Sequence, residues 1–117
     1  MTTTGYLEET ILDTSAVTSD VTSAAVDMSN HEHFSVQFTW TSSTASASLI
    51  IEESNDGVNW AVFDSTKNNT INNDSSTAMR TTNDSGAGLF EAKYLRAKLD
   101  YSSGTIDTIT AILFAKP

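Results

Sequence analysis

Hydrophobic and polar residues alternate with a period of two in several stretches of this chain. In the clearest stretch the apolar positions are Phe34, Val36, Phe38 and Trp40, and the positions between them are polar. Residues 45–52 and 94–101 continue the same alternation. A period of two that includes aromatic and β-branched residues is typical of half-buried strands. The pattern therefore predicts three strands and places Trp40 in the core beside Phe38.

Turn signals separate these runs. Asn55-Asp56-Gly57 follows the second strand, and a further short strand is expected at 58–63. Because Asp and Gly both tolerate a positive φ, the Asp-Gly pair predicts a hairpin with a type I′ turn. We expect Trp60 to pack across this hairpin. Ser102-Ser103-Gly104 predicts a second tight turn, which leads into a last strand at 105–115.

The last strand is apolar on both sides over its second half. Ile112 and Phe114 fall on one side, and Ile109 and Leu113 fall on the other. Such a strand is either central in a sheet or covered on its outer face by another chain.

The remaining segments carry weaker signals. Residues 6–12 and 17–28 are strand candidates, and short strands are expected around Ile71 and Met79 within the loop-rich stretch 67–88. About eight short strands in sequence indicate an all-β fold, a single antiparallel β-sandwich or jelly-roll-like domain. We expect residues 13–117 to form this domain and residues 1–12 to be an extended N-terminal arm or a first strand.

Composition supports the all-β interpretation and narrows the function classes. The 117 residues suit one domain, and Thr, Ser and Asn, which favour strand surfaces and turns over helices, make up 42 of them. A net charge of −9 disfavours nucleic-acid binding, and the lack of cysteine excludes disulfides and thiolate chemistry. No apolar stretch approaches the length of a membrane helix, and Met1-Thr2-Thr3-Thr4 shows no secretory leader, so we expect no membrane partner.

Charge is unevenly distributed along the chain. Residues 1–66 contain ten acids and no Lys or Arg, whereas residues 67–117 contain all six bases. An edge that carries Arg96 and Lys98 would then complement an acidic edge on a neighbouring copy. The alternative is an acidic surface that only maintains solubility.

Candidate chemistry is sparse, and no arrangement indicates an enzyme. His31-Glu32-His33 has metal-ligand spacing, but a turn before the strand would spoil its geometry. The loop pairs Asn55-Asp56, Asn72-Asn73-Asp74 and Asn83-Asp84 allow structural calcium, although Asn and Asp also belong in turns. No cofactor is expected. Trp60 with Asn55 and Asp56 offers a stacking surface and polar groups for a sugar.

Several pieces of the chain together resemble a known class of protein. They are the Ser35-Val36-Gln37 strand, the segment from Ser54 to Trp60 (SNDGVNW), the Tyr94-Leu95-Arg96 strand and the ending Phe114-Ala115-Lys116. Over roughly residues 20–117 the chain resembles small β-sandwich structural proteins of bacteriophage virions, of the capsid decoration, cement or head-fibre and spike type. The SNDGVNW and YLR pieces are also similar to discoidin-like sandwiches that bind sugars or lipids.

The resemblance implies a non-enzymatic protein on the capsid exterior, synthesised in the bacterial host cytoplasm. Its partners would be the major capsid protein or another shell protein, and further copies of itself in a symmetric oligomer, taken as a trimer. We expect the contacts to come from the arm, the basic edge and the last strand: Tyr6, Leu7, Ile11, Arg96, Lys98, Ile109 and Leu113. The alternative is a carbohydrate-binding or adhesin module that recognises host glycans through Trp60, Asn55 and Asp56.

Overall fold

The computed structural model describes residues 5–63, 69–71, 74–82 and 89–117, and within these ranges the chain forms strands and no α-helix. The ten strands are β1 (Leu7–Val17), β2 (Val21–Thr22), β3 (Val26–Asp27), β4 (His33–Ser43), β5 (Ser46–Ser54), β6 (Ala61–Val62), β7 (Asn69–Ile71), β8 (Asp74–Thr81), β9 (Tyr94–Ser103) and β10 (Ile106–Lys116). None of the described segments is a helix that could cross a membrane.

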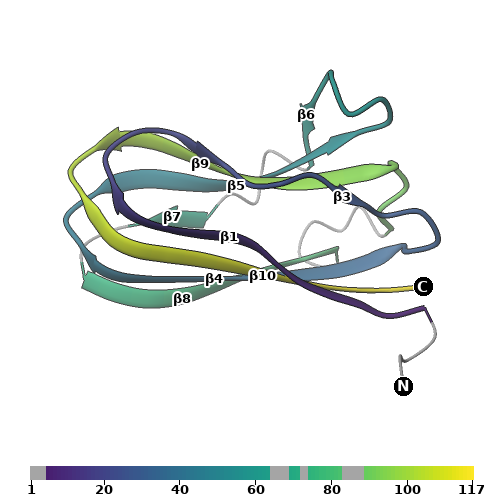
Figure 1. Ribbon diagram of the computed structural model, residues 1–117, viewed down its shortest axis with the longest axis horizontal. Helices are drawn as coiled ribbons and strands as arrows, with labels where there is room; N and C mark the ends of the chain where they lie inside the picture. Colours follow the sequence, from purple (N-terminus) through teal and green to yellow (C-terminus); the bar gives the residue numbers. More distant parts are fainter. Residues whose placement is uncertain (1–4, 64–68, 72–73, 83–88) are drawn as a thin grey trace.

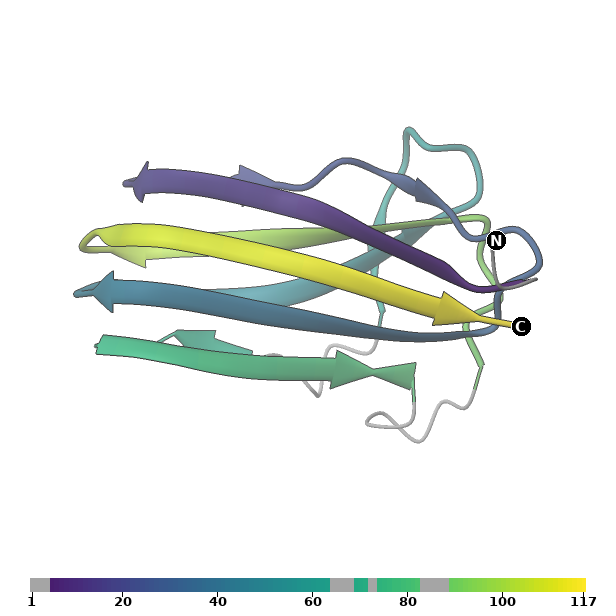
Figure 2. The same ribbon diagram turned by 60° about the horizontal axis from the view of Figure 1, so that its bottom comes forward.

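The strands form two antiparallel sheets that pack face to face (Figures 1 and 2). One sheet has four strands in the order β1-β10-β4-β8. The other has six, with β9 and β5 at its centre, β2 and β3 along the outer edge of β9, and β6 and β7 along the outer edge of β5. This arrangement confirms the predicted all-β sandwich.

The six-stranded sheet contains only four strand positions. Because β2 and β3 both pair with β9, they are two parts of one interrupted strand, and β6 and β7 are likewise two parts of one strand beside β5. The sandwich therefore has eight strand positions, and most successive positions alternate between the two sheets. Eight positions in two facing sheets is the jelly-roll type of arrangement.

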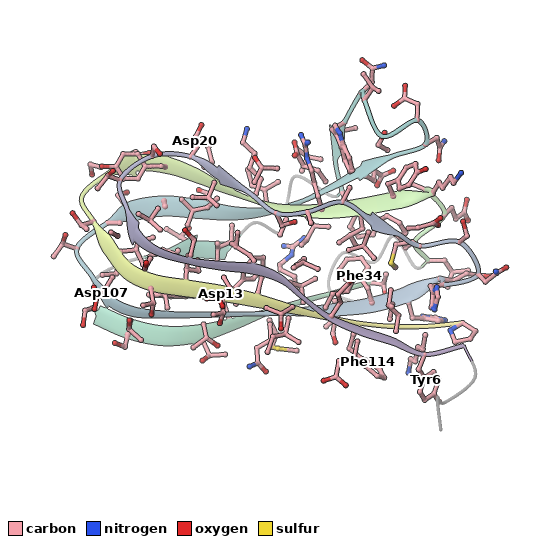
Figure 3. The ribbon with its side chains drawn as sticks, viewed as in Figure 1. Tyr6, Asp13, Asp20, Phe34, Asp107 and Phe114 are labelled. Atoms are coloured by element: carbon pink, nitrogen blue, oxygen red, sulfur yellow. The ribbon has the colours of Figure 1, made fainter. Side chains whose placement is uncertain are left out.

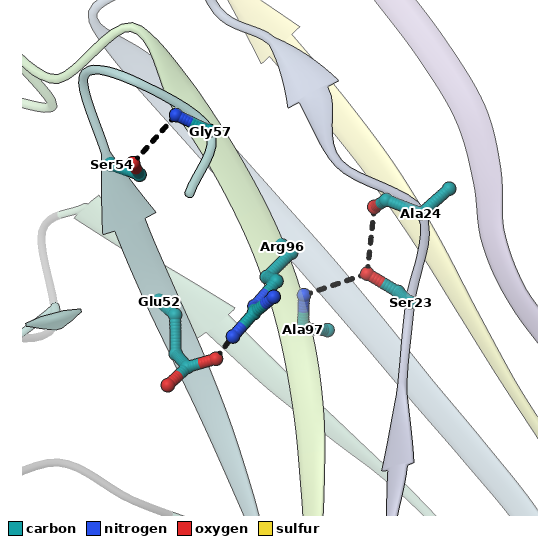
Figure 4. Close-up of polar contacts among 7 residues, drawn as sticks. All are labelled: Ser23, Ala24, Glu52, Ser54, Gly57, Arg96 and Ala97. Carbon is teal, nitrogen blue, oxygen red and sulfur yellow. Dashed lines mark hydrogen bonds and ion pairs between the residues drawn. The ribbon is translucent and has the colours of Figure 1, made fainter. Parts of the chain in front are cut away.

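A serine side chain spans the interruption between β2 and β3. Ser23 Oγ accepts a hydrogen bond from the amide of Ala97 at 2.8 Å and donates one to the carbonyl of Ala24 at 2.9 Å (Figure 4). The amide of Ser23 in turn donates to the carbonyl of Ala97 at 2.8 Å. The hydroxyl thus replaces a missing ladder partner, so the amide of Ala97 in the buried strand β9 stays satisfied.

The core lies between the two inner faces. The alternate residues predicted to face inward are buried on β4, β5 and β9, and Trp40 is 5% exposed. At one end of the core, Phe34, Phe63 and Phe90 form a cluster whose ring centroids are 5.4 to 5.7 Å apart. Edge-on and tilted contacts of this kind add to the stabilisation from burial alone.

The hairpin predicted after β5 is present, because β5 and β6 pair antiparallel, but the predicted type I′ turn is wrong. Gly57 has a φ of +74°, but Asp56 does not have the positive φ that a type I′ turn requires at both central positions. The chain instead makes a longer loop before β6, whose conformation is held by side chains. Ser54 Oγ accepts from the amide of Gly57 (Figure 4) and from that of Asp56. Asp56 Oδ1 accepts from the amides of Val58 and Asn59 at 2.8 Å.

Residues 7–12 belong to a strand within the fold. They form the first half of β1, which pairs with β10 of the same chain from Leu7 to Val17. Ile11 and Leu12 are buried in the core, at 6% and 7% exposed. The expected boundary at residue 12 therefore falls inside a strand, because these apolar side chains complete the core of their own chain.

Two glycine substitutions test the tightness of the turns. Gly104 has a φ of +83°, and a Cβ there would meet the carbonyl oxygen of Thr44 and lie 2.7 Å from the Cα of Ala45. We expect Gly104→Ala to lower the free energy of unfolding by about 3 kcal/mol, since backbone strain and overpacking add. At Gly57 the nearest atom, on the Tyr94 ring, is 3.6 Å away, so Gly57→Ala should cost only about 1 kcal/mol. Urea denaturation measures both, and equal losses would contradict the close approach at Gly104.

The loop after β5 should weaken in acid. Hydrogen bonds from the amides of Asn59 and Val58, the side chain of Asn59 and the hydroxyl of Ser54 hold the pKa of Asp56 well below its ordinary value of 3.8. A depressed pKa means that the carboxylate stabilises the fold fully above 3.8, and that this contribution is lost as the pH falls further. We expect Asp56→Ala to lower the thermal midpoint clearly at neutral pH and much less in strong acid. Asp107→Ala, which removes an exposed acid elsewhere, is the control for net charge. If the thermal midpoint of Asp56→Ala is lower than that of the wild type by the same amount at neutral and acid pH, the role of the charged carboxylate is contradicted.

Candidate functional site

The outer surface of the four-stranded sheet is the first candidate binding surface, and we call it the four-stranded face. Strand register places its side chains in cross-strand rows. Ile112 lies between Thr10 and Gln37, and Gln37 in turn pairs with Met79. Two residues further along β10, Phe114 lies between Glu8 and Ser35 in the next row on the same face.

Four large apolar side chains on this face are exposed, and we call them the apolar patch: Tyr6, Met79, Ile112 and Phe114. Their exposed fractions are 50%, 47%, 37% and 37% respectively. The rings of Tyr6 and Phe114 meet edge-on, with centroids 5.6 Å apart, and both lie on the outer side of the sheet, whereas Phe34 lies within the sandwich (Figure 3). Single exposed apolar residues are ordinary, but several gathered on one face indicate an interaction surface.

A shallow pocket of about 660 Å³ lies at one end of the patch. Tyr6 and Phe114 line it together with His33 and Lys116, which occupy neighbouring register positions on β4 and β10. This end of the face therefore combines aromatic rings with a cationic group.

The other end of the face is polar and built from threonines. The hydroxyls of Thr41 and Thr108 are 2.6 Å apart, and those of Thr39 and Thr77 are 3.4 Å apart. These cross-strand pairs stabilise the sheet and keep the surface even. Asp107 also lies at this end, far from Tyr6 and Phe114 (Figure 3).

Of the contact residues expected on the arm and the last strand, some are exposed and others are buried. Tyr6 is exposed, and Leu7 is half-buried against the core. Ile11 is buried, and Ile109 and Leu113 are 0% exposed. Their side chains point between the sheets and form no part of a surface, because the register of β10 turns Ile112 and Phe114 outward instead. The sequence had left open which side of the last strand faces the core.

The basic residues expected at an interface lie on the outer side of the six-stranded sheet. Arg96 Nε forms an ion pair with Glu52 Oε1 at 2.7 Å (Figure 4). Its guanidinium also stacks on the Trp60 ring, 4.2 Å from the centroid. The charge of Arg96 is thus engaged within its own chain. Lys98 is half-buried at the register position opposite Ile50.

Trp60 and the loop before it form the second candidate surface, which we call the Trp60 pocket. It is a hollow of about 290 Å³. Its lining residues come from the end of β5, the following loop, the start of β6 and the segment before β9: Glu53, Ser54, Asn55, Asn59, Trp60, Ala61 and Ala92. Trp60 is partly buried, and the guanidinium of Arg96 lies against one face of its ring.

Two of the residues expected to contact a glycan have different roles here. Asn55 lines the pocket, and its Oδ1 accepts from the amide of Lys93 at 3.0 Å. Asp56 does not line the pocket. Both of its carboxylate oxygens are bonded within the loop, Oδ1 to the Ser54 hydroxyl and backbone amides and Oδ2 to Asn59 Nδ2.

Sequence reasoning missed Glu53 and Asn59 in this pocket. Partial burial raises the pKa of Glu53 above its ordinary value. In the described part of the chain burial is the cause of this shift, and no hydrogen bond or neighbouring charge opposes it. Glu53 follows Glu52 in a charged pair near the end of a strand, and that pair alone does not show which of the two lies opposite Arg96.

The metal-ligand candidates are not brought together. The ring of His31 is bonded through Nδ1 to the carbonyl of Ser29 in the turn before β4, and His33 is the first residue of that strand. Over residues 5–63, 69–71, 74–82 and 89–117, no three His, Asp or Glu side chains gather as a metal site. Asn72, Asn73, Asn83 and Asp84 lie outside the described residues.

Comparison with known proteins shows the fold. No protein-family model and no curated protein sequence matches the chain. A chain from the Bacillus endospore appendages, which are described as disulfide-linked pili, has a TM-score of 0.55 at 12% identity and covers 96% of this chain and 88% of its own. A carbohydrate-binding module of Cellvibrio mixtus lichenase 5A, solved with cellotriose, has a TM-score of 0.51 at 13% identity and covers 97% and 88%.

A family 11 carbohydrate-binding module from Clostridium thermocellum, solved with a β-1,3-1,4-mixed-linked tetrasaccharide, has a TM-score of 0.41 at 12% identity and covers 96% and 84%. The chain is thus similar in fold to the β-sandwich of the appendage chain and of the Cellvibrio module, at sequence identities that show the fold alone.

Proposed function

We propose that this protein is a non-enzymatic structural module of a bacteriophage virion, of the capsid decoration, cement or spike-base type. It attaches to a shell protein and to copies of itself on the outside of the capsid. The sequence resemblance to such proteins supports this role. The likeness in fold to a chain of a pilus-type appendage supports the use of such a sandwich as a structural subunit.

The observation that carries the proposal is the apolar patch on the four-stranded face. Ile112 and Phe114 are on β10, which is paired on both sides and therefore rigid. A rigid face with apolar side chains toward one end and threonines toward the other suits docking against another protein surface. Many weak contacts of this kind, repeated over a symmetric shell, add to stable attachment.

The proposal places the attachment on a sheet face and not on an N-terminal arm. Residues 7–12 are paired with β10, so they are not a free arm that could reach into a neighbouring chain. The acids Glu8 and Glu9 are exposed on this edge strand, and charge on an edge disfavours pairing with another sheet.

Exchanging the apolar patch for polar residues tests the proposal. We expect the double variant Ile112→Thr, Phe114→Thr to lose at least about tenfold in binding to virus particles from the strain that carries the gene, since two buried apolar contacts are lost. Cosedimentation with the particles measures the loss, and light scattering after size exclusion measures self-association. Thr favours strands, so the sheet should be kept.

Val62→Thr is the matched control, because Val62 is 40% exposed on the other sheet. It should leave both measurements unchanged. Equal binding by the double variant and the wild type would show that the four-stranded face is not the attachment surface. A wild-type chain that stays monomeric and does not sediment with particles would contradict the virion role itself.

A carbohydrate-binding module is the second candidate function, and the Trp60 pocket favours it. A partly buried tryptophan and the amide side chains of Asn55 and Asn59 line one hollow, and residues of these types are suited to a sugar ring with its hydroxyls. The likeness in fold to a carbohydrate-binding module solved with cellotriose also supports this candidate. The two functions use different surfaces and are compatible in one protein.

A further inference from the structure

We propose that two copies of this protein pair through β8, antiparallel and about a two-fold axis at Ser76, so that their four-stranded sheets join into one continuous sheet. This inference rests on the proposed virion role, because it names the surface through which copies contact each other. It concerns an edge of the sheet, whereas the shell protein contacts the apolar patch on the face.

The edge at β8 is open to solvent. Figure 2 shows β8 at the border of its sheet, and in the described part of the chain no strand pairs with its other side. The register partner of Ser76 is Trp40, which faces the core, so the side chain of Ser76 is on the inner side of the sheet, yet it is exposed. Ser75 and Thr77, on the outer side, are exposed as well. The edge is therefore accessible from both sides at residues 75–77.

The other sheet edges that the structure describes are protected against pairing. Charges, bulges and very short strands are the usual means of protection. On β1, Glu8, Glu9 and Asp13 are exposed, and the register is irregular between Thr10 and Leu12. The edges of the six-stranded sheet consist of pieces of two or three residues, β2 and β3 on one side and β6 and β7 on the other.

β8 has none of these protections over residues 75–79. It is 8 residues long, and its register with β4 is regular from Thr81 to Ser76. An irregularity beyond Ser76 adds its extra residue to β4 and not to β8. No charged residue, proline or glycine occurs from Ser75 to Met79. A long, regular and uncharged edge is a template for pairing with another chain.

A second copy fits this edge because the pairing is self-complementary. A two-fold axis at Ser76 places Ser75 of each copy opposite Thr77 of the other. Both side chains are on the outer side of the sheet, so side-chain alternation is kept across the joint. The hydroxyls of Thr39 and Thr77 already form a cross-strand pair at 3.4 Å, and a pair of Ser75 with Thr77 continues this row into the second copy.

Charge also favours this edge over other parts of the surface. Each copy has a net charge of −9, so two copies repel each other at most points of contact. Ser75, Ser76 and Thr77 are uncharged, so the joint places no like charges opposite each other, which would destabilise a sheet.

Pairing through β8 brings the apolar patches of two copies onto one surface. Met79 of the patch is on β8 itself, and Gln37 lies between it and Ile112. The ladder is short, so the dimer is weak in solution. Two copies that contact one shell are held side by side, and their effective concentration strengthens both contacts. The two-fold axis predicts a dimer and not the trimer that the resemblance implies.

A single cysteine tests the pairing directly, because the chain contains none. In Ser76→Cys the two side chains are directly opposite each other, with Cβ atoms about 5 Å apart, a separation that a disulfide spans after a small shift. We expect mild oxidation to convert most of this variant to a covalent dimer on a non-reducing gel. Ser15→Cys, at an exposed position on β1, is the matched control and should stay mostly monomeric.

Sedimentation velocity over a range of concentrations measures the dimer without a crosslink. We expect the mass of the wild type to rise toward that of a dimer with concentration. Ser76→Lys should raise the dissociation constant by about tenfold, since it places like charges opposite each other. Ser15→Lys makes the same change in net charge on the other edge and should leave the dimer unchanged. Both variants are less negative than the wild type, so overall repulsion does not explain a weaker dimer. Thermal melting shows that the fold is kept.

The outcomes separate this inference from the virion role. Equal crosslinking of Ser76→Cys and Ser15→Cys, or a dimer that Ser76→Lys does not weaken, overturns pairing through β8, while particle binding still tests the virion role. A monomeric wild type whose particle binding is lost in Ser76→Lys overturns a second copy as the partner and assigns this edge to the shell protein. A wild type that pairs through β8 but does not sediment with particles keeps the inference and overturns attachment to the shell.

Discussion

The register of β10 between β1 and β4 is the constraint on which the rest of this structure depends. It turns Ile109, Ala111, Leu113 and Ala115 into the core and leaves Ile112 and Phe114 on the surface. Because side chains alternate along a strand, a slip of one residue would exchange the two sets and empty the core. The apolar patch is thus a direct consequence of how this strand is paired, and it cannot move without the fold.

The two candidate surfaces differ in how they are held. The apolar patch lies on paired strands, so its shape is set by backbone ladders and by the packing of the core beneath it. The Trp60 pocket lies on a loop, and side-chain bonds from Ser54 and Asp56 provide the order that a ladder would otherwise give. Binding residues on loops supported by a rigid scaffold are common in β-sandwiches. A structural role for one surface leaves the other free for a ligand.

The interior contains one residue that pattern reasoning would place outside. Arg80 is 1% exposed and pairs with Val36, which itself faces the core, so its side chain points between the sheets. Arginine is rarely buried, and β8 consists mostly of Ser, Thr and Ala, so its period-two pattern is masked. The strand was expected around Met79, but the burial of Arg80 was not.

The sequence by itself determined the all-β sandwich, the strands with clear alternation and the core positions of Phe34, Phe38 and Trp40, because a period of two states directly which residues share a face. It also singled out Trp60 and Asn55 as polar and aromatic neighbours on one loop. Only the tertiary structure decided which side of β10 is buried, since both of its sides are apolar. It likewise decided that Glu52 is the acid that binds Arg96, because that depends on which residue of β9 lies opposite it.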